Sequence, residues 1–135
     1  MLRHIPVEFL QETWPIVLPG LEKVSTHSCE ADTTEQIERA LLQGAAYLLL
    51  AITPEANYEG FIILRPEQSF TGRKNLHIWA VFSKDADLDK RLPEIETLAK
   101  SAGFETITFA AFRKGWRRRM KSFEPTYQLY RKVLK

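Results

Sequence analysis

Cysteine and long apolar runs are scarce in this sequence of 135 residues. Cys29 is the only cysteine, so the chain forms no disulfide within itself, which is typical of a reducing compartment. The apolar stretch LLLAI at 48–52 is far too short to span a bilayer. The first residues show neither an apolar signal-peptide core nor a small-residue cleavage site. We therefore expect a soluble cytoplasmic protein with no membrane contact.

Motifs for metal binding and for nucleophilic catalysis are missing as well. His27 and Cys29 lie two residues apart, but no second pair of ligands stands at a spacing that completes a zinc site. The sequence contains no Gly-x-Ser-x-Gly elbow, no Walker-type phosphate loop and no Rossmann glycine pattern. We therefore expect no metal centre and none of the activities that these motifs support.

Apolar and aromatic side chains are plentiful. Hydrophobic residues make up 44% and charged residues 27% of the chain, with eight Phe, four Tyr and three Trp. This composition and the length predict one domain over residues 1–135 with a well-packed core. The net charge is only +2, but six Lys or Arg and no acidic residue stand between Arg113 and Lys121.

The stretch from Leu76 to Phe112 predicts the centre of the fold. LHIWAVF at 76–82 and FETITFAAF at 104–112 are strand-like, and the segment between them has the pattern of a helix that starts near Asp87 or near Pro93. A strand, a helix and a second strand in this order form a parallel pair joined by a crossover helix.

The flanking segments supply the remaining elements. Pro6 opens a helix that Pro15 and Pro19 divide into two short pieces, and a second helix begins at Asp32 or Thr33. The apolar segments 46–53 and 58–65 form a hairpin, followed by a polar loop over 66–74, and after the central unit come a basic helix at 113–122 and a strand at 126–134.

The order of these elements resembles that of the GNAT superfamily of N-acetyltransferases. The resemblance is carried by LHIWAVF at 76–82, PEIETLAKSAGF at 93–104, ETITFAAF at 105–112, RKGWRRRMKSFEP at 113–125 and TYQLYRKVL at 126–134. It implies an α/β (α+β mixed) fold, a single GNAT-like domain whose central sheet is mixed and mostly antiparallel, with helices on both faces. It also implies that the sheet splays between strands 76–82 and 104–112.

The resemblance places the family's CoA pyrophosphate loop directly after the strand 76–82. The loop residues are Lys84, Asp85, Ala86, Asp87, Leu88, Asp89, Lys90 and Arg91. In the family, glycines let phosphate approach backbone N–H groups at a helix N-terminus. Here the loop has no glycine and three aspartates, and like charges about 4 Å apart near a surface repel by roughly 4 kcal/mol. We therefore predict that no cofactor binds; the alternative is an acetyl-CoA site in which Lys84, Lys90, Arg91 and Arg113 hold the phosphates.

The resemblance also indicates where catalytic groups would stand. The family's general acid is a tyrosine four residues before a glycine, and here Arg118 occupies that place relative to Ser122. The family's general base varies and often lies on the fourth strand or its neighbour, where His77 and Glu59 are the candidates. A hydrogen-bonded structural histidine is the other interpretation of His77, because a base needs an open cleft before its pKa matters.

The basic segment predicts a contact surface. Trp116 and Met120 lie at helical spacing on one face, and the arginines face solvent. The predicted partner-binding residues are Arg113, Lys114, Trp116, Arg117, Arg118, Arg119 and Lys121. Such a cationic helix binds nucleic-acid phosphates or an acidic protein surface, and the remaining interpretation is a solvated helix face.

Two functions follow from this sequence. The first is a GNAT-like protein without standard acetyl-CoA chemistry that acts by binding, as an accessory protein that is phage-encoded or virion-associated and located in the host cytoplasm or the virion. The alternative is an acyl-CoA-dependent N-acetyltransferase with a divergent pyrophosphate loop. The absent glycines and the three aspartates favour the first.

Overall fold

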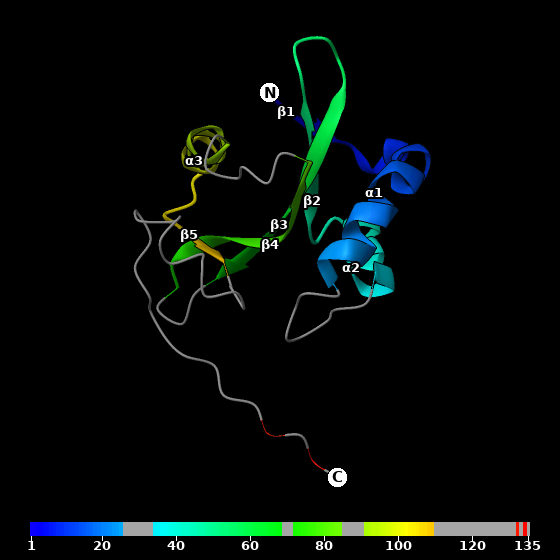
Figure 1. The fold of residues 1–135 in the computed structure, drawn as a ribbon. Helices are drawn as coiled ribbons and strands as arrows, with labels where there is room; N and C mark the ends of the chain where they lie inside the picture. Colours follow the sequence, from blue (N-terminus) through cyan, green and yellow to red (C-terminus); the bar gives the residue numbers. More distant parts are fainter. Residues whose placement is uncertain (26–33, 69–71, 85–90, 110–131, 133, 135) are drawn as a thin grey trace.

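The fold is a five-stranded sheet with helices on both faces (Figure 1). The computed structural model describes residues 1–25, 34–68, 72–84 and 91–109, together with residues 132 and 134. Its elements are β1 (Leu2–Ile5), the 3-10 turn η1 (Val7–Phe9), α1 (Leu10–Ser25), α2 (Thr34–Leu42), β2 (Tyr47–Ile52), β3 (Tyr58–Gln68), β4 (Lys74–Ser83), α3 (Leu92–Ser101) and β5 (Thr106–Phe109). The strands lie in the order β1-β2-β3-β4-β5. All neighbours are antiparallel except β4 and β5, which are parallel.

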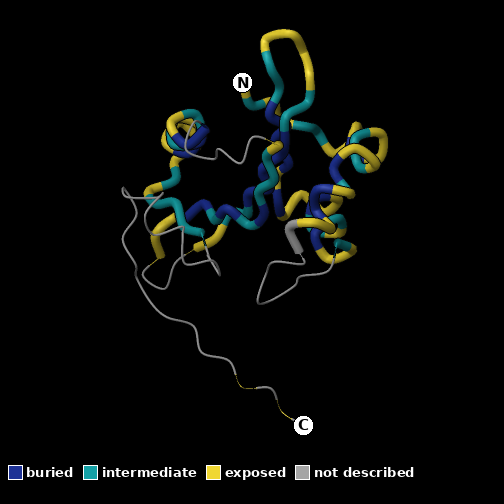
Figure 2. The backbone as a smooth tube through the Cα atoms, viewed as in Figure 1, coloured by how far each residue is buried: buried dark blue, intermediate teal, exposed yellow. Residues whose placement is uncertain are grey.

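Two apolar clusters fill the two sides of the sheet. On one side α1 and α2 pack against β2, β3 and β4 through side chains that include Val17, Leu41 and Phe61. On the other side α3 packs through Leu92, Ile95 and Ala99 against alternate residues of the same strands. Figure 2 shows the deeply buried positions concentrated along the strands and on the inner sides of the helices. The predicted mixed sheet with helices on both faces is therefore confirmed.

The N-terminal segment differs from its prediction in two ways. Residues 2–5 form the edge strand β1, paired with residues 48–51, whereas a helix was expected to open at Pro6 without a strand before it. α1 is also one helix and not two pieces, although Pro15 and Pro19 lie inside it. Pro15 and Pro19 have no N–H to donate, so the carbonyls of Gln11 and Pro15 lose their helical hydrogen bonds. All three residues are exposed. Solvent can therefore reach those carbonyls while the opposite face of the helix packs on the sheet.

The strands β3 and β4 are longer than the predicted strands 58–65 and 76–82. β3 extends to Gln68 and β4 begins at Lys74, so much of the predicted polar loop over 66–74 is paired backbone. The strands are held together there by polar cross-strand pairs such as Glu67 with Asn75. Because these residues do not alternate with apolar ones, the sequence pattern wrongly predicted a loop. α3 begins at Leu92 with Pro93 in its first turn, which confirms the later of the two predicted starts.

Two β-bulges shape the sheet. β4 has one more residue than β3 between the pairs Ile63–Ala80 and Leu64–Ile78, and the extra residue is Trp79. Trp79 and Ala80 therefore both pack on the α1 side although they are consecutive. In the same way, β3 has one extra residue, Glu59, opposite Ala51 and Ile52 of β2.

The edge strand is tied to α3 by a long-range hydrogen bond. The backbone N–H of Leu2 donates to Oε2 of Glu94 at 2.6 Å. Glu94 lies in the first turn of α3, where a carboxylate is favoured by the helix dipole.

None of the helices in the described residues is long and apolar enough to cross a membrane. The predicted helix at 113–122 and strand at 126–134 lie outside the described residues.

Gly60 offers a test of the hairpin packing. A Cβ at this position would lie 2.1 Å from the backbone oxygen of Phe82, so Gly60→Ala forces β3 and β4 apart. We expect it to lower the free energy of unfolding, measured with urea, by about 3 kcal/mol or more. Gly20→Ala is the matched control, because its Cβ would meet only aromatic side chains, the Phe82 ring at 2.9 Å first, in a helix where Ala is preferred. Equal stability of the two variants would contradict this account.

Candidate functional site

A row of polar side chains crosses β3, β4 and β5 on one face of the sheet. Its members, which we call the polar row, are Arg65 and Glu67 of β3, Asn75 and His77 of β4, and Thr106 and Thr108 of β5. The strand register aligns Glu67, Asn75 and Thr106 in one line and Arg65, His77 and Thr108 in the next. The residues next to them in the strands, such as Leu64, Leu76 and Ile107, belong to the cluster under α3, so the polar row lies on the opposite face.

Side-chain hydrogen bonds connect the row. Asn75 Nδ2 donates to Thr108 Oγ1 at 2.7 Å and to Glu67 Oε1 at 3.4 Å, and Asn75 Oδ1 accepts from Thr106 Oγ1 at 2.8 Å. His77 Nδ1 lies 2.9 Å from Thr108 Oγ1. Asn75 is only 6% exposed, so this buried amide has its polar atoms satisfied by the row.

His77 is held in its neutral form by its surroundings. Its side chain is 16% exposed, and burial, which disfavours the imidazolium, lowers its pKa below the ordinary 6.5. The carboxylate of Glu67, 3.8 Å from Nδ1, raises the pKa, and the guanidinium of Arg65 lowers it, so the two charges oppose each other. Among the described segments, the hydrogen-bond partner of the ring is Thr108 at Nδ1, and no residue there makes a hydrogen bond to Nε2.

Arg65 links the row to the bulge in β4. Its Nη2 donates to Glu67 Oε2 at 3.3 Å, and its guanidinium carbon lies 4.5 Å from the centre of the Trp79 ring. The indole therefore covers one side of the cation and separates the polar row from the apolar cluster under α1.

The predicted general base Glu59 and the predicted phosphate ligand Arg91 contact each other. Arg91 precedes α3 and is only 8% exposed, and its Nη2 forms an ion pair with Oε2 of Glu59. The Nε of Arg91 is buried and makes no hydrogen bond to the described residues. Each charge is therefore balanced by the other, and the pair fastens the start of α3 to the bulge in β3.

The two predicted bases are not brought together. Glu59 lies beside Lys84, whose backbone N–H donates to the Glu59 carbonyl at 2.8 Å, at the far end of β4 from His77. Six residues of strand span on the order of 20 Å, so Glu59 and His77 cannot act on the same substrate atom. The Lys84 ammonium lies 5.3 Å from the centre of the Tyr58 ring. Asp85, Ala86, Asp87, Leu88, Asp89 and Lys90 lie outside the described residues.

The predicted partner-binding segment lies outside the described residues too. It comprises Arg113, Lys114, Trp116, Arg117, Arg118, Arg119 and Lys121. Within the described parts of the chain, no three His, Cys, Asp or Glu side chains gather as a metal site.

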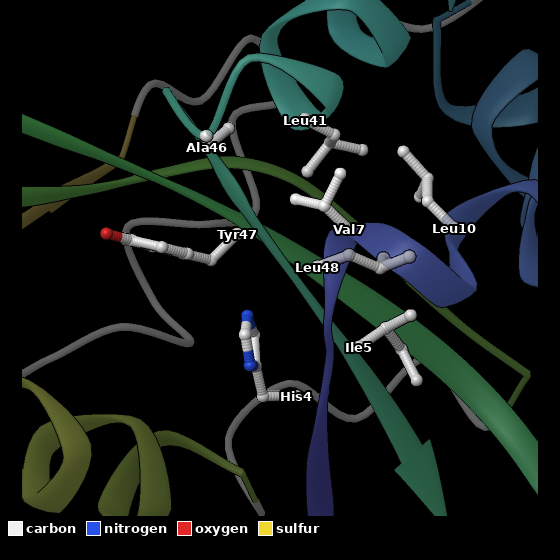
Figure 3. A pocket seen from close by; sticks show the side chains of 9 residues that line it. His4, Ile5, Val7, Leu10, Leu41, Ala46, Tyr47 and Leu48 are labelled. Atoms are coloured by element: carbon white, nitrogen blue, oxygen red, sulfur yellow. The ribbon is translucent and has the colours of Figure 1, made fainter.

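A small apolar hollow lies between β1, η1, the end of α2 and the start of β2 (Figure 3). Its volume is about 70 Å³, and Figure 3 shows Val7, Leu10 and Leu41 on one side with His4 beside Tyr47 on the other. The two rings form an edge-to-face contact with centres 5.7 Å apart. Ligand pockets usually reach about 300 Å³ or more, so this hollow is too small for a cofactor.

Sequence reasoning found His77 but missed its partners. Thr106 and Thr108 alternate with apolar residues in the strand after α3, and Arg65 and Glu67 alternate in the strand before β4. This two-residue alternation was the available signal, because alternate residues of neighbouring strands share one face.

The pKa of His77 makes the stability of the fold depend on pH. Because that pKa is lowered in the folded state, the unfolded chain takes up this proton first as the pH falls. The free energy of unfolding should therefore be retained above the ordinary histidine pKa and should decrease below it. Urea unfolding between about pH 8 and pH 5 should show this loss, and His77→Gln should flatten the profile. A profile that stays equally steep in the variant would contradict the assignment.

The pair of Glu59 and Arg91 predicts an asymmetric mutational response. Glu59→Gln leaves a buried guanidinium without its carboxylate and should lower the free energy of unfolding by about 1–3 kcal/mol. Adding Arg91→Met should recover part of that loss, because no unpaired charge then remains. Glu105→Gln is the matched control. Its ion pair with Arg73 is exposed on both sides and should change stability by less than about 0.5 kcal/mol in urea unfolding. A Glu59 variant as stable as this control would contradict the buried pair.

Comparison with known proteins supports the architecture. No family model matches the sequence, and no curated protein matches it. Among solved structures, a probable acetyltransferase superposes with a TM-score of 0.70 at 13% identity, covering 100% of this chain and 97% of that chain.

Two further structures match over the same extent. An aminoglycoside acetyltransferase from an uncultured soil metagenomic sample, in complex with sisomicin, has a TM-score of 0.69 at 14% identity and covers 100% of this chain and 96% of that chain. A ribosomal-protein-alanine N-acetyltransferase from Brucella melitensis biovar Abortus 2308 has a TM-score of 0.64 at 16% identity and covers 100% and 98%. The sheet order, the parallel β4–β5 pair and these full-length superpositions together mean that this chain has the GNAT fold.

Proposed function

We propose that this protein is an acetyl-CoA-dependent N-acetyltransferase. The observation that carries the proposal is the polar row on the β4–β5 pair, the single parallel pair among the described strands, with a neutral histidine at its centre. The three structures described above, which it resembles over nearly their full length, are acetyltransferases by their names. This supports the enzymatic alternative over a protein that acts only by binding.

His77 is the residue proposed to meet the reacting groups. Thr108 orients its ring through Nδ1, which leaves Nε2 for a substrate atom. Its pKa lies below the ordinary value, so the ring carries no charge at neutral pH and does not repel a cationic amine. Glu59 is not assigned such a role, because its carboxylate is paired with Arg91.

The described residues at the start of α3 fit a phosphate site only in part. Arg91 brings a cation to this helix end, but Glu59 balances its charge, and Pro93 lacks the N–H that this position would otherwise offer. Lys84 and Lys90 therefore remain as the cations proposed to hold the CoA phosphates. Acetyl-CoA, when bound, supplies the acetyl group.

The second candidate is a GNAT-fold protein that binds no CoA and acts through its basic segment. The Glu59–Arg91 pair favours it, because the buried cation nearest the start of α3 is already neutralised. An acidic protein or nucleic acid would then be the partner of residues 113–121. The phage-encoded or virion-associated role stays a prediction.

Titration calorimetry with acetyl-CoA and with free CoA at low salt separates the two candidates. We expect micromolar binding of both ligands to the full chain. Because each lysine contributes charge-assisted contacts to phosphate, Lys84→Ala with Lys90→Ala should weaken that binding at least about tenfold. Lys100→Ala, an exposed lysine in the last turn of α3, should leave the affinity unchanged. Absence of binding heat at high protein concentration would overturn the enzyme proposal and leave the binding protein.

A further inference from the structure

The orientation of the Asn75 amide is fixed by its neighbours. One of its polar atoms faces Glu67 Oε1 at 3.4 Å, and Arg65 Nη2 lies 3.3 Å from the other oxygen of that carboxylate. An ionised carboxylate only accepts hydrogen bonds. The atom of Asn75 that faces it is therefore the Nδ2 donor, and the opposite orientation would place two oxygens against each other.

The Asn75 orientation determines where the Thr108 proton goes. Nδ2 of Asn75 also faces Thr108 Oγ1 at 2.7 Å, so Thr108 accepts a hydrogen bond from it. Among the described residues, the one remaining atom within hydrogen-bond distance of Thr108 Oγ1 is His77 Nδ1, at 2.9 Å. A half-buried hydroxyl satisfies its proton when an acceptor is in reach, so Thr108 donates to Nδ1.

The proton of a neutral imidazole must then be on the other nitrogen. Nδ1 accepts from Thr108, and a neutral histidine has one donor and one acceptor nitrogen. We propose that the polar row acts as a relay, from Arg65 through Glu67, Asn75 and Thr108, that fixes His77 as the Nε2–H tautomer and presents it to a substrate as a hydrogen-bond donor. Glu67, Asn75 and Thr108 are positioning residues in this relay, because they act through His77.

This arrangement reverses the role expected for His77. A general base at Nε2 would need the proton on Nδ1, and the relay places it on Nε2. The substrate atom that meets Nε2 is therefore an oxygen acceptor, such as a carbonyl or carboxylate, and not an ammonium. The identity of that oxygen rests on the proposed acetyl transfer, in which a carbonyl gains negative charge during the reaction. The tautomer itself does not depend on that function.

Long-range proton–nitrogen NMR of the free, ¹⁵N-labelled full chain tests the tautomer directly. The His77 signals are identified by their loss in His77→Gln. At a pH above the pKa of His77, we expect the Nε2 signal to be of the pyrrole type, which carries the proton. We expect the Nδ1 signal to be of the pyridine type, which does not. A proton on Nδ1 in the wild-type protein would overturn the relay.

Glu67→Gln is the decisive variant. Arg65 keeps the carbonyl oxygen of the introduced amide toward itself, so the nitrogen of that amide faces Asn75 and forces the Asn75 amide to turn over. Thr108 then donates to Asn75, and His77 carries its proton on Nδ1. We expect the ring-nitrogen signals to move toward that tautomer in Glu67→Gln and to stay unchanged in Glu105→Gln, whose ion pair with Arg73 lies outside the row. No change in the Glu67 variant would overturn the relay.

Two substitutions of His77 test its role once acetyl transfer is measured. Glutamine places an amide N–H near the position of Nε2, whereas asparagine places one near Nδ1. If His77 is a donor, His77→Gln should keep kcat/KM within about tenfold of wild type and His77→Asn should lose about 10²–10³-fold. If both variants lose activity equally, His77 acts as a base and the donor role is wrong. Because the NMR result needs no acetyl-CoA, failure of the enzyme proposal and failure of the relay remain distinguishable.

Discussion

The pairing of β4 along both of its edges is the constraint on which the structure depends. β4 is antiparallel to β3 over most of its length and parallel to β5 through Ile78, so it joins the N-terminal antiparallel part to the crossover through α3. Its side chains supply both apolar clusters, and the bulge at Trp79 changes which of them faces α1. A substitution that moved β4 would disturb both clusters and the polar row at once.

The main strands and the crossover helix were predictable because they are apolar and periodic. The runs around Leu49, Phe61 and Ile78 are buried on a sheet covered on both faces, and burial on both faces produces continuous apolar sequence. β1 was not predictable in this way, because four residues give no measurable alternation and its pairing is decided by β2, more than forty residues away. The two prolines of α1 misled the prediction because local rules do not include the packing of its buried face.

The candidate site was only partly predictable. His77 stood out as a titratable residue on a central strand, but Thr108 is thirty-one residues away and contributes one hydroxyl, which has no motif. Glu59 was predicted as a general base and Arg91 as a phosphate ligand, but the two side chains form an ion pair with each other. The charge of a residue therefore does not by itself indicate its role. Over a separation of thirty-two residues, sequence does not indicate which charges neutralise each other. Bulge residues such as Trp79 and Glu59 depend on register, which is a property of two strands together.

The hydrogen bond between Leu2 and Glu94 has a consequence for behaviour in concentrated solution. Met1 exchanges backbone bonds with Ile52, so the outward-facing backbone groups of β1 belong to Leu2 and His4. Glu94 already occupies the first outward N–H, and its carboxylate places negative charge on this margin. An incoming strand would have to displace that carboxylate to gain a ladder of at most two residues. This edge of the sheet is therefore protected against edge-to-edge pairing with another chain, although β1 contains neither proline nor lysine.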